Sequence, residues 1–145
     1  MASDIFAKIG DIKGESLDSK HKDEVEVLSW SWGVAQHGNM AFGGGGGSGK
    51  ASFNDFNFTH FIDKASPVLM KACATGEHLK EATITARKAG KGQQEFLIIK
   101  MNDVIITSVN PSGSGESAVH ENVTLQCAKI DLEYKPQKPD GSLDA

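Results

Sequence analysis

Residues 24–36 place the strongest constraint on the fold, because large and small side chains alternate along this segment. The large residues occupy one parity of position, namely Leu28, Trp30, Trp32 and Val34. The small or polar residues occupy the other, namely Ser29, Ser31, Gly33 and Ala35. A period of two is typical of a β-strand with one buried face, so we expect the large residues inside. Val25 and Val27 have the opposite phase, which predicts a β-bulge near Val27 to Ser29.

Further segments of the chain are alternating or continuously apolar, at 4–9, 51–61, 81–88, 93–109 and 121–134. The stretches 96–99 and 104–106 are apolar on both faces, which indicates a strand covered on both sides. Short strands separated by turn residues predict a mainly β fold, a compact barrel of antiparallel strands. We expect loops at 37–50, which is long, extended and rich in glycine, and at 110–119.

One short α-helix is predicted after residue 65. Ser66 is a suitable N-cap, Pro67 suits the first helical position, and Gly76 is a natural stop. The expected apolar stripe is Leu69, Met70, Cys73 and Ala74. A helix of two to three turns is not stable alone in water, so we expect it to dock on the sheet.

The composition is that of one soluble domain over residues 1–145, with 39% apolar and 23% charged residues. A net charge of −4 without basic clusters argues against nucleic acid as a partner. The N-terminus lacks the pattern of a secretory signal peptide, and the absence of an 18-residue apolar run argues against membrane insertion. We therefore expect folding in the cytoplasm and any export by a route without a signal peptide.

The residues that could take part in catalysis or metal binding are more simply explained by structural roles. Cys73 and Cys127 belong to no C-x-x-C pair and are expected to be reduced, buried side chains. The histidines lack metal-ligand spacing; His60 is expected to be a satisfied core or rim residue and His21 to lie in a solvated turn. The carboxylates are scattered through turns, as on a solvated face. We expect no catalytic, cofactor-binding or metal-binding residue, and no enzyme.

The segment Gly44–Lys50 fits the first part of a phosphate-binding loop, G-x-x-x-x-G-K. A true phosphate-binding loop continues with a hydroxyl residue and opens a helix, whereas here Ala51 and an alternating segment follow. A flexible hairpin loop is favoured over a nucleotide site. A third interpretation is a protruding arm, in which Met40 and Phe42 dock on a partner.

The two faces of the strand at 29–33 suggest different roles. Trp30 and Trp32 could stack on a ligand, but two tryptophans on one strand face are more often core residues. The opposite strip of Ser29, Ser31 and Gly33 is small and mildly polar. Such a strip suits a wall past which other molecules slide, and it equally suits any exposed strand.

Several segments together resemble the hemolysin-coregulated protein (Hcp) family of bacterial type VI secretion systems. The N-terminal matches are Lys8–Ser16, His21–Glu24 and Val27–Gly33. The others are the glycine-rich loop ending in Gly49-Lys50, Asp63–Met70 followed by Cys73, Arg87–Gly90, Glu121–Thr124 and Tyr134–Lys138. They occur in the family's order and spacing, and together they cover nearly the whole chain.

The resemblance implies a structural subunit that forms homohexameric rings, which stack into a hollow tube like a phage tail tube. The implied partners are a contractile sheath around the tube, a spike protein at its tip and effector proteins in its lumen. Assembly in the cytoplasm and release outside the cell after firing are implied as well. Family members usually continue beyond the Pro136–Lys138 segment with another strand. Either the sequence is truncated relative to the family, or the barrel lacks its last strand and exposes an unpaired strand edge.

Two sets of residues follow as site predictions. The loop expected to contact the next ring contains Met40, Phe42, Gly43, Gly44, Gly45, Gly46 and Gly47. Ser29, Ser31 and Gly33 are expected to face the lumen. Two other roles stay open, a carrier or chaperone of effectors and a stand-alone small-ligand-binding β-barrel. Ring assembly would separate the tube protein from the ligand-binding barrel.

Overall fold

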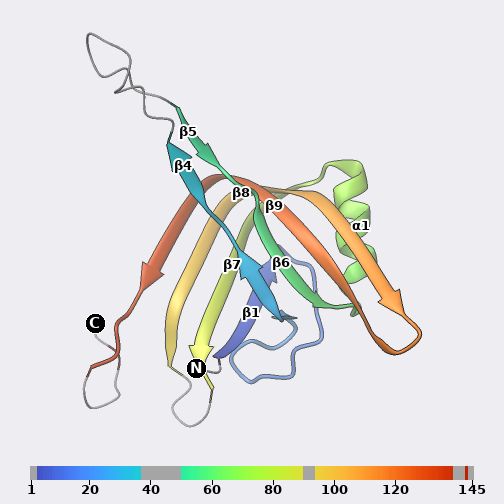
Figure 1. Ribbon diagram of the computed structural model, residues 1–145, viewed down its shortest axis with the longest axis horizontal. Coiled ribbons are helices and arrows are strands. Elements are labelled where there is room, and N and C mark those ends of the chain that lie inside the picture. The colour runs from blue at the N-terminus through green and yellow to red at the C-terminus, as the bar shows by residue number, and fades with distance from the viewer. Residues whose placement is uncertain (1–2, 37–49, 90–93, 139–142, 144–145) are drawn as a thin grey trace.

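The computed structural model describes residues 3–36, 50–89, 94–138 and 143. Nine strands and one helix lie in these ranges (Figure 1). The N-terminal strands are β1 (Ser3–Ile9), β2 (Val25–Val27), β3 (Ser29–Ser31), β4 (Val34–Gln36), β5 (Ala51–Phe53) and β6 (Phe56–Phe61). The helix α1 (Ser66–Thr75) and the strands β7 (His78–Lys88), β8 (Glu95–Ser114) and β9 (Ser117–Tyr134) follow. The fold is mainly β with one short helix, as expected.

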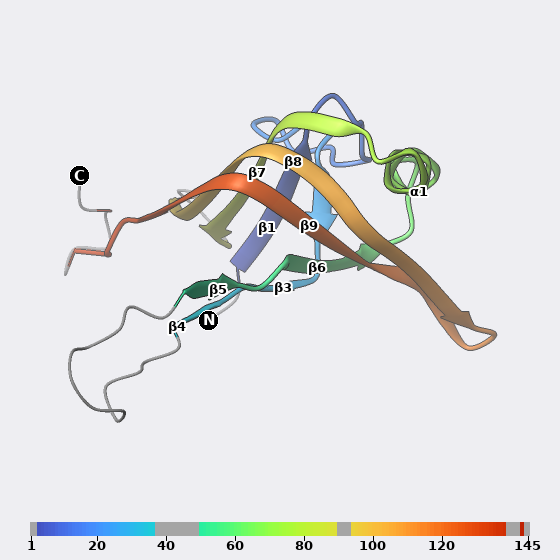
Figure 2. The same ribbon diagram turned by 90° about the horizontal axis from the view of Figure 1, so that it is seen from above.

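Seven strands form one antiparallel sheet in the order β2-β1-β7-β8-β9-β6-β3. The two outermost strands, β2 and β3, are consecutive in the chain and are separated only by Leu28. β2 pairs with β1, whereas β3 pairs with β6, so one bent segment hydrogen-bonds to both ends of the sheet. The sheet therefore curls into a nearly closed barrel, as Figure 2 shows from above.

The bend at Leu28 explains why the alternation at 24–36 does not predict correctly which large side chains are buried. Val25 and Val27 are buried, whereas Leu28 and Val34 are about half exposed, so the expectation that all the large residues lie inside is wrong. The side-chain phase changes at the bend, within the interval where the bulge was expected. Trp30 and Trp32 are partly buried and pack against the core. Trp30 stacks on Phe56 with ring centroids 5.8 Å apart.

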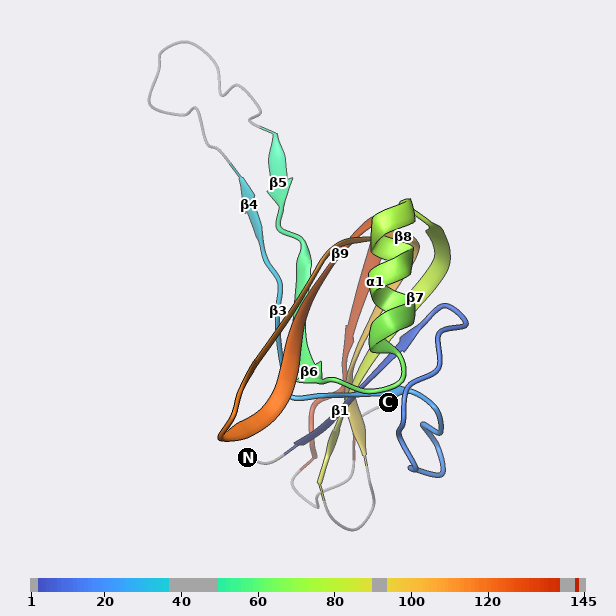
Figure 3. The same cartoon turned by 90° about the vertical axis from the view of Figure 1, so that its right-hand side faces the viewer.

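Beyond β3 and before β6, the chain leaves the barrel as a two-stranded ribbon of β4 and β5. The register pairs Val34 with Phe53 and Gln36 with Ala51. Each residue of these two strands is exposed. Figures 1 and 3 show the ribbon projecting away from the barrel. The single strand expected at 51–61 is thus two strands, interrupted at Asn54 and Asp55.

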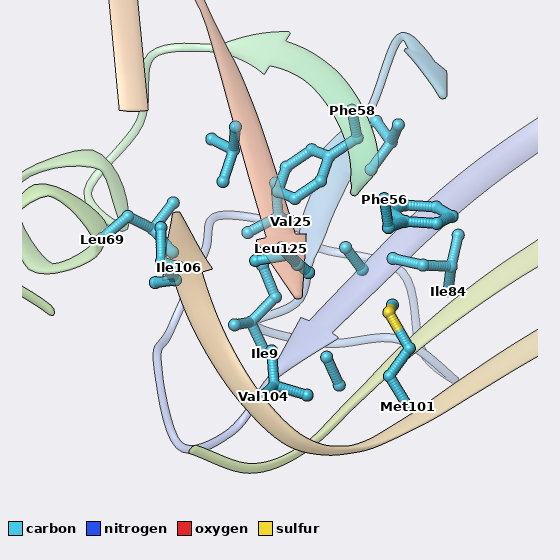
Figure 4. Packing of buried hydrophobic residues seen from close by; sticks show 14 of the residues in the cluster. Ile9, Val25, Phe56, Phe58, Leu69, Ile84, Met101, Val104, Ile106 and Leu125 are labelled. Atoms are coloured by element: carbon cyan, nitrogen blue, oxygen red, sulfur yellow. The ribbon is translucent and has the colours of Figure 1, made fainter. Parts of the chain in front are cut away.

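The core of the barrel is a continuous cluster of buried apolar side chains from both sides of the curled sheet (Figure 4). Phe56 from β6 lies beside Ile84 from β7 and above Met101 from β8 in Figure 4, and these three side chains and Phe58 are almost inaccessible to solvent. Alternate residues along each strand supply these side chains, as period-two patterning requires. The interior of the barrel is therefore filled by protein.

Helix α1 begins one residue earlier than expected. Its N-cap is Ala65, and the Ser66 hydroxyl instead accepts a hydrogen bond of 3.1 Å from the Asp63 backbone N–H. Asp63 Oδ1 accepts from the Ala65 N–H at 2.8 Å, so the two side chains brace the turn. Leu69 and Ala72 form the buried face, whereas Met70 and Ala74 are exposed.

The end of the helix is as expected. Gly76 adopts a left-handed conformation with φ of 67°, and its N–H donates to Cys73 O at 3.2 Å. Leu69 packs into the core cluster, and Figure 4 shows it beside Ile106 of β8. The helix therefore docks on the sheet.

The segment 110–119 is not a loop. Strands β8 and β9 continue through it as a paired hairpin, with Asn110 opposite Asn122 and Ser114 opposite Ser117. Its residues are exposed, so no apolar pattern marks it in the sequence. The glycines, serines and Pro111 suggested a loop, but cross-strand hydrogen bonds with a neighbouring strand determine the structure here.

Candidate assembly surfaces

The expected lumen-facing residues Ser29 and Ser31 lie on the outer face of β3, opposite Trp30. In register, Ser29 pairs with Thr59 and Ser31 with Asn57, both on β6. On the next strand, β9, Asn122 lies opposite Thr59 along the same face. Asn122 Nδ2 donates to Asn57 Oδ1 at 2.6 Å and to Thr59 Oγ1 at 3.1 Å.

This face continues across β9 onto β8. Thr124 Oγ1 lies 2.7 Å from Thr107 Oγ1 and 2.6 Å from Ser108 Oγ, and Thr107 donates to Asp55 Oδ2 at 2.8 Å. The result is a polar band across four strands: Ser29, Ser31, Asn57, Thr59, Thr107, Ser108, Asn122 and Thr124. Each of these side chains is uncharged, and several satisfy one another's hydrogen bonds. The sequence pattern indicated only the β3 part, because the other members become neighbours through strand pairing.

Gly33 lies two residues beyond the end of β3 rather than within the band. Its carbonyl oxygen accepts a hydrogen bond of 2.9 Å from the Asn54 N–H. A Cβ at this position would lie 3.2 Å from Asn54 Nδ2. The structure therefore places Gly33 against the turn between β5 and β6, where the ribbon joins the barrel.

Strand β9 has pairing strands on both sides along only part of its length among the described residues. β8 pairs with β9 along its whole length, whereas β6 pairs only with residues 120–125. Within the described residues, 126–134 of β9 therefore have a strand on one side only. Leu132 and Tyr134 on this part of β9 are 57% and 62% exposed. Their partners Ile99 and Leu97 place them on the core-facing side of the sheet, at an end that β6 does not cover.

A groove of about 450 Å³ lies where β6 diverges from β9, and we call it the Cys127 groove. Its aromatic side is formed by Trp32, Phe53 and Phe56, and β9 contributes Cys127 and Ile130. Trp32 stacks on Phe53 with centroids 6.2 Å apart. Burial raises the pKa of the Cys127 thiol, which disfavours a reactive thiolate. Cys73 and Cys127 are both free and half-buried.

The expected ring-stacking loop, Met40, Phe42 and Gly43 to Gly47, lies outside the described residues. The residues after it are described, and Ala51–Phe53 form strand β5. A phosphate-binding loop requires a helix at this point. The glycine-rich motif therefore lacks the structural context of a nucleotide site.

His21 lies in a turn, as expected, but its side chain is buried rather than solvated. The residue is 7% exposed, and its ring stacks on Phe6 with centroids 4.5 Å apart. Nδ1 lies 3.0 Å from Glu24 Oε2 and Nε2 lies 2.7 Å from Glu95 Oε1. Glu95 is 74 residues away in the chain, so no local pattern could reveal the contact.

Arg87 is a second member of this cluster that no sequence pattern indicated. Its guanidinium is buried, donates to both carboxylate oxygens of Asp18 at 2.8 and 2.6 Å, and lies 4.8 Å from the Phe6 ring centroid. Hydrogen bonds from Arg87 lower the pKa of Asp18 to about 2. The cluster fastens the segment between β1 and β2 to the outside of the sheet.

His60 is a core histidine, as expected, but it is not fully satisfied, because only one of its two ring nitrogens is hydrogen-bonded to the described residues. Nε2 lies 2.7 Å from Oε1 of Glu121, and both side chains are fully buried. Nδ1 makes no hydrogen bond to the described residues, and Asp63 Oδ2 lies 3.9 Å from it. Burial raises the pKa of the Asp63 carboxyl. The His60–Glu121 pair joins β6 to β9 beside the start of helix α1.

Possible metal ligands are not gathered at any point of the described chain. Among those residues, no group of three or more histidine, cysteine, aspartate or glutamate side chains could hold a metal ion. In the same part of the chain, no helix is long and apolar enough to cross a membrane.

The fold defines a class of protein: a nearly closed β-barrel with a filled interior, a docked helix and an exposed ribbon. The family model described as "Type VI secretion system effector, Hcp" matches residues 6–134. "Protein hcp1" of Pseudomonas aeruginosa is 51% identical over 99% of this chain and 90% of its own length. The chain therefore belongs to the Hcp family of type VI secretion proteins.

Solved structures agree with this assignment. Hcp1 from Salmonella typhimurium is 43% identical and superimposes with a TM-score of 0.78 over 92% of this chain and 88% of its own. A structure described as a type six secretion system protein is 28% identical, with a TM-score of 0.93 over 99% and 91%. The family and fold expected from the sequence are confirmed.

Proposed function

We propose that this chain is the structural subunit of a type VI secretion tube, built from homohexameric rings that stack around a hollow lumen. Membership of the Hcp family over residues 6–134 carries the proposal. The part of β9 that β6 does not pair with supports the proposal. An exposed strand edge promotes pairing with other chains, which is a liability in a protein that acts alone and a contact surface in one that assembles. A closed ring requires each copy to present two different surfaces to its neighbours.

The β9 edge at 126–134, with Leu132, Tyr134 and the adjacent Cys127 groove, is the surface we assign to contact between neighbours in a ring. Among the described residues no second strand pairs with this edge, and its exposed apolar side chains favour contact with another protein chain. A ring would also protect this edge from nonspecific pairing. Light scattering on the full chain tests the proposal: a mass of six copies supports the ring, and a monomer at high concentration contradicts it.

The polar band is the surface we assign to the lumen. Small uncharged side chains that satisfy one another's hydrogen bonds leave few groups to hold a passing molecule. Ser29 and Ser31 therefore remain our lumen-facing residues, whereas Gly33 belongs to the base of the ribbon. Ser31→Gln places a longer amide in the band and should change the retention of a co-expressed effector. Unchanged retention in intact rings would remove this assignment.

The loop with Met40, Phe42 and Gly43 to Gly47 is proposed to contact the next ring. The exposed ribbon that leads to it supports this role, because β4 and β5 carry the chain away from the barrel. Replacement of residues 38–49 by a short turn should leave rings intact but abolish stacks. Stacks of unchanged length would contradict the role.

The proposed partners follow from this function: a contractile sheath outside the tube, a spike protein at its tip and effector proteins in the lumen. Assembly in the cytoplasm and release after firing complete the proposal. The packed interior favours the tube role over a stand-alone ligand-binding barrel, because Phe56, Phe58, Ile84 and Met101 fill the space that a ligand would need. The proposed role is structural and requires no catalysis or cofactor.

A further inference from the structure

Both ring nitrogens of His21 face a carboxylate oxygen. Nδ1 lies 3.0 Å from Glu24 Oε2, and Nε2 lies 2.7 Å from Glu95 Oε1. An ionised carboxylate only accepts hydrogen bonds, and a neutral imidazole carries a single N–H. Both contacts can therefore be hydrogen bonds only if the ring carries two protons or if one of the glutamates is protonated.

The exposure of the two glutamates favours the charged ring. The side chains of Glu24 and Glu95 are 15% and 34% exposed, whereas that of His21 is 9% exposed. Carboxylates that reach water retain their charge at neutral pH, and an opposite charge within hydrogen-bond distance favours the protonated form of a histidine. A neutral ring would instead place the lone pair of one nitrogen against a carboxylate oxygen.

The other charged groups around the ring also favour a positive charge there. Asp18 Oδ2 accepts a hydrogen bond of 3.2 Å from the His21 backbone N–H, and Arg87 of β7 binds the Asp18 carboxylate. Asp4 of β1 lies 3.5 Å from the Arg87 guanidinium. Together with the two glutamates, these groups are four carboxylates and one guanidinium. A proton on His21 reduces this excess of negative charge.

The His21 contacts hold the connection between β1 and β2 at the end of the β7–β8 pair. Arg87 and Glu95 are direct cross-strand partners, next to a register shift between Ala86 and Arg87. Each of them contacts the connection, Arg87 through Asp18 and Glu95 through His21. Figure 3 shows the connection in blue, outside the strands of the barrel. One of these two attachments requires a proton.

The turn that carries His21 can move without unpacking the barrel. Backbone hydrogen bonds from the Gly14 N–H to Asp23 O at 2.7 Å and from the Ser16 N–H to Glu24 O at 3.0 Å close the base of this turn. The core cluster of the described chain includes no residue from 15–24. Residues 17–22 therefore form a small unit whose position depends on the side chains of Asp18 and His21.

We propose that His21, Glu24 and Glu95 form a proton-dependent latch, which we call the His21 latch. The imidazolium holds residues 17–22 against the β7–β8 end, and loss of its proton releases this turn while the barrel stays folded. Histidine is the side chain whose charge ordinarily changes closest to neutral pH. The latch makes this part of the molecular surface dependent on pH, and it does not rest on the proposed tube function.

The ¹⁵N chemical shifts of the His21 ring measure its protonation directly, with the signals identified by their loss in His21→Gln. At pH 7 both nitrogens should show the shifts of an imidazolium. A neutral tautomer at pH 7 would overturn the latch. A ring that keeps both protons up to pH 10 would overturn it as well.

Trypsin cleavage after Lys20 and Lys22 measures release of the turn, because both lysines are exposed and flank His21. Division of each rate by that of a free peptide of residues 15–24 removes the pH dependence of the protease. Between pH 7 and pH 10 the relative rate should rise about tenfold or more, because the turn loses a hydrogen bond between charged groups. The rise should have the midpoint of the ¹⁵N shifts, and the fluorescence of Trp30 and Trp32 should stay native.

Glu95→Gln is the decisive variant, because its amide N–H can donate to a neutral imidazole and no proton is needed. It should keep the slow cleavage of the wild type at pH 7 and lose most of the rise at high pH. Glu133→Gln is the matched control, because Glu133 is an exposed glutamate of β9 that pairs with Lys135. Glu95→Gln with the full rise, or Glu133→Gln without it, would contradict the latch.

Discussion

The Arg87 guanidinium donates two hydrogen bonds to the Asp18 carboxylate, at 2.8 and 2.6 Å, and thereby joins β7 to the segment between β1 and β2. Planar guanidinium and carboxylate groups match in this two-pronged geometry. Asp4 adds a weaker contact at 3.5 Å. The pair lies beside the ring of Phe6, on which the His21 ring also stacks. This cluster holds the connection between β1 and β2 against the sheet. The described residues of that connection, 10–24, form no helix or named strand.

We predict that the Asp18–Arg87 pair contributes stability that is lost in acid. Hydrogen bonds from Arg87 lower the Asp18 pKa from 3.8 to about 2. A lowered pKa stabilises the folded state above the unfolded value, and this contribution disappears as the pH falls from about 4 to about 2. Asp18→Asn should lower the melting temperature at neutral pH and flatten its change between these pH values. A variant with the acid profile of the wild type would contradict the prediction.

The buried pair of His60 and Glu121 gives a second prediction. Glu121→Ala should destabilise the fold by about 3–5 kcal/mol, because it leaves a buried polar partner without compensation. His60→Leu combined with Glu121→Leu should return to within about 1 kcal/mol of wild type, because an apolar pair of similar volume needs no partner. Urea denaturation measures the three free energies of unfolding.

An exposed ion pair provides the control for that experiment. Lys129 Nζ lies 3.8 Å from Asp131 Oδ2, and both side chains are more than half exposed. Lys129→Ala should therefore change the free energy of unfolding by less than about 1 kcal/mol. If Lys129→Ala lowered the free energy of unfolding as much as Glu121→Ala does, burial would not explain why the His60–Glu121 pair contributes more to stability.

Gly14 gives a third prediction, because the chain at the start of β2 approaches it closely. A Cβ at this position would lie 2.5 Å from Glu24 O and 2.9 Å from Val25 Cα. Gly14→Ala should destabilise the fold by about 1–3 kcal/mol, since backbone atoms must move to admit the methyl group. Gly115→Ala is the matched control, because a Cβ at position 115 would meet no atom within 4 Å. Equal thermal stability of the two variants would contradict the prediction.

The fourth prediction concerns the β9 edge. Leu132→Lys places a charge among apolar residues at the proposed contact between neighbours in a ring, and should weaken ring association about tenfold or more. The melting temperature should change little, because Leu132 is already 57% exposed in the single chain. Light scattering gives the mass. Intact hexamers at low concentration would show that this edge lies outside the ring interface.

Local patterns predicted the features that depend on neighbouring residues. The alternation of large and small residues indicated a β-barrel, and Pro67 and Gly76 marked the helix within one residue of its observed ends. The expected strands at 81–88, 93–109 and 121–134 correspond to β7, β8 and β9, which extend further. These signals suffice because strand periodicity and helix punctuation are properties of the local chain.

The features that local patterns did not indicate depend on contacts between distant segments. The chain bends at Leu28 because the residues before it pair with β1 and the residues after it pair with β6. His21, in the connection between β1 and β2, is buried because Phe6 of β1 and Glu95 of β8 contact it. The polar band extends beyond Ser29 and Ser31 because pairing aligns β3, β6, β9 and β8. None of these neighbours can be identified from a single sequence before the strand order is known.

The bent segment at Leu28 also affects how the barrel unfolds. Because β2 and β3 hold the two ends of one sheet, release of this segment opens both ends together. Separate loss of either half is then disfavoured, and we expect a cooperative transition in which amide hydrogens of β1 and β6 exchange with solvent at similar rates. A barrel that opens only as a whole is consistent with the proposed role as a tube subunit.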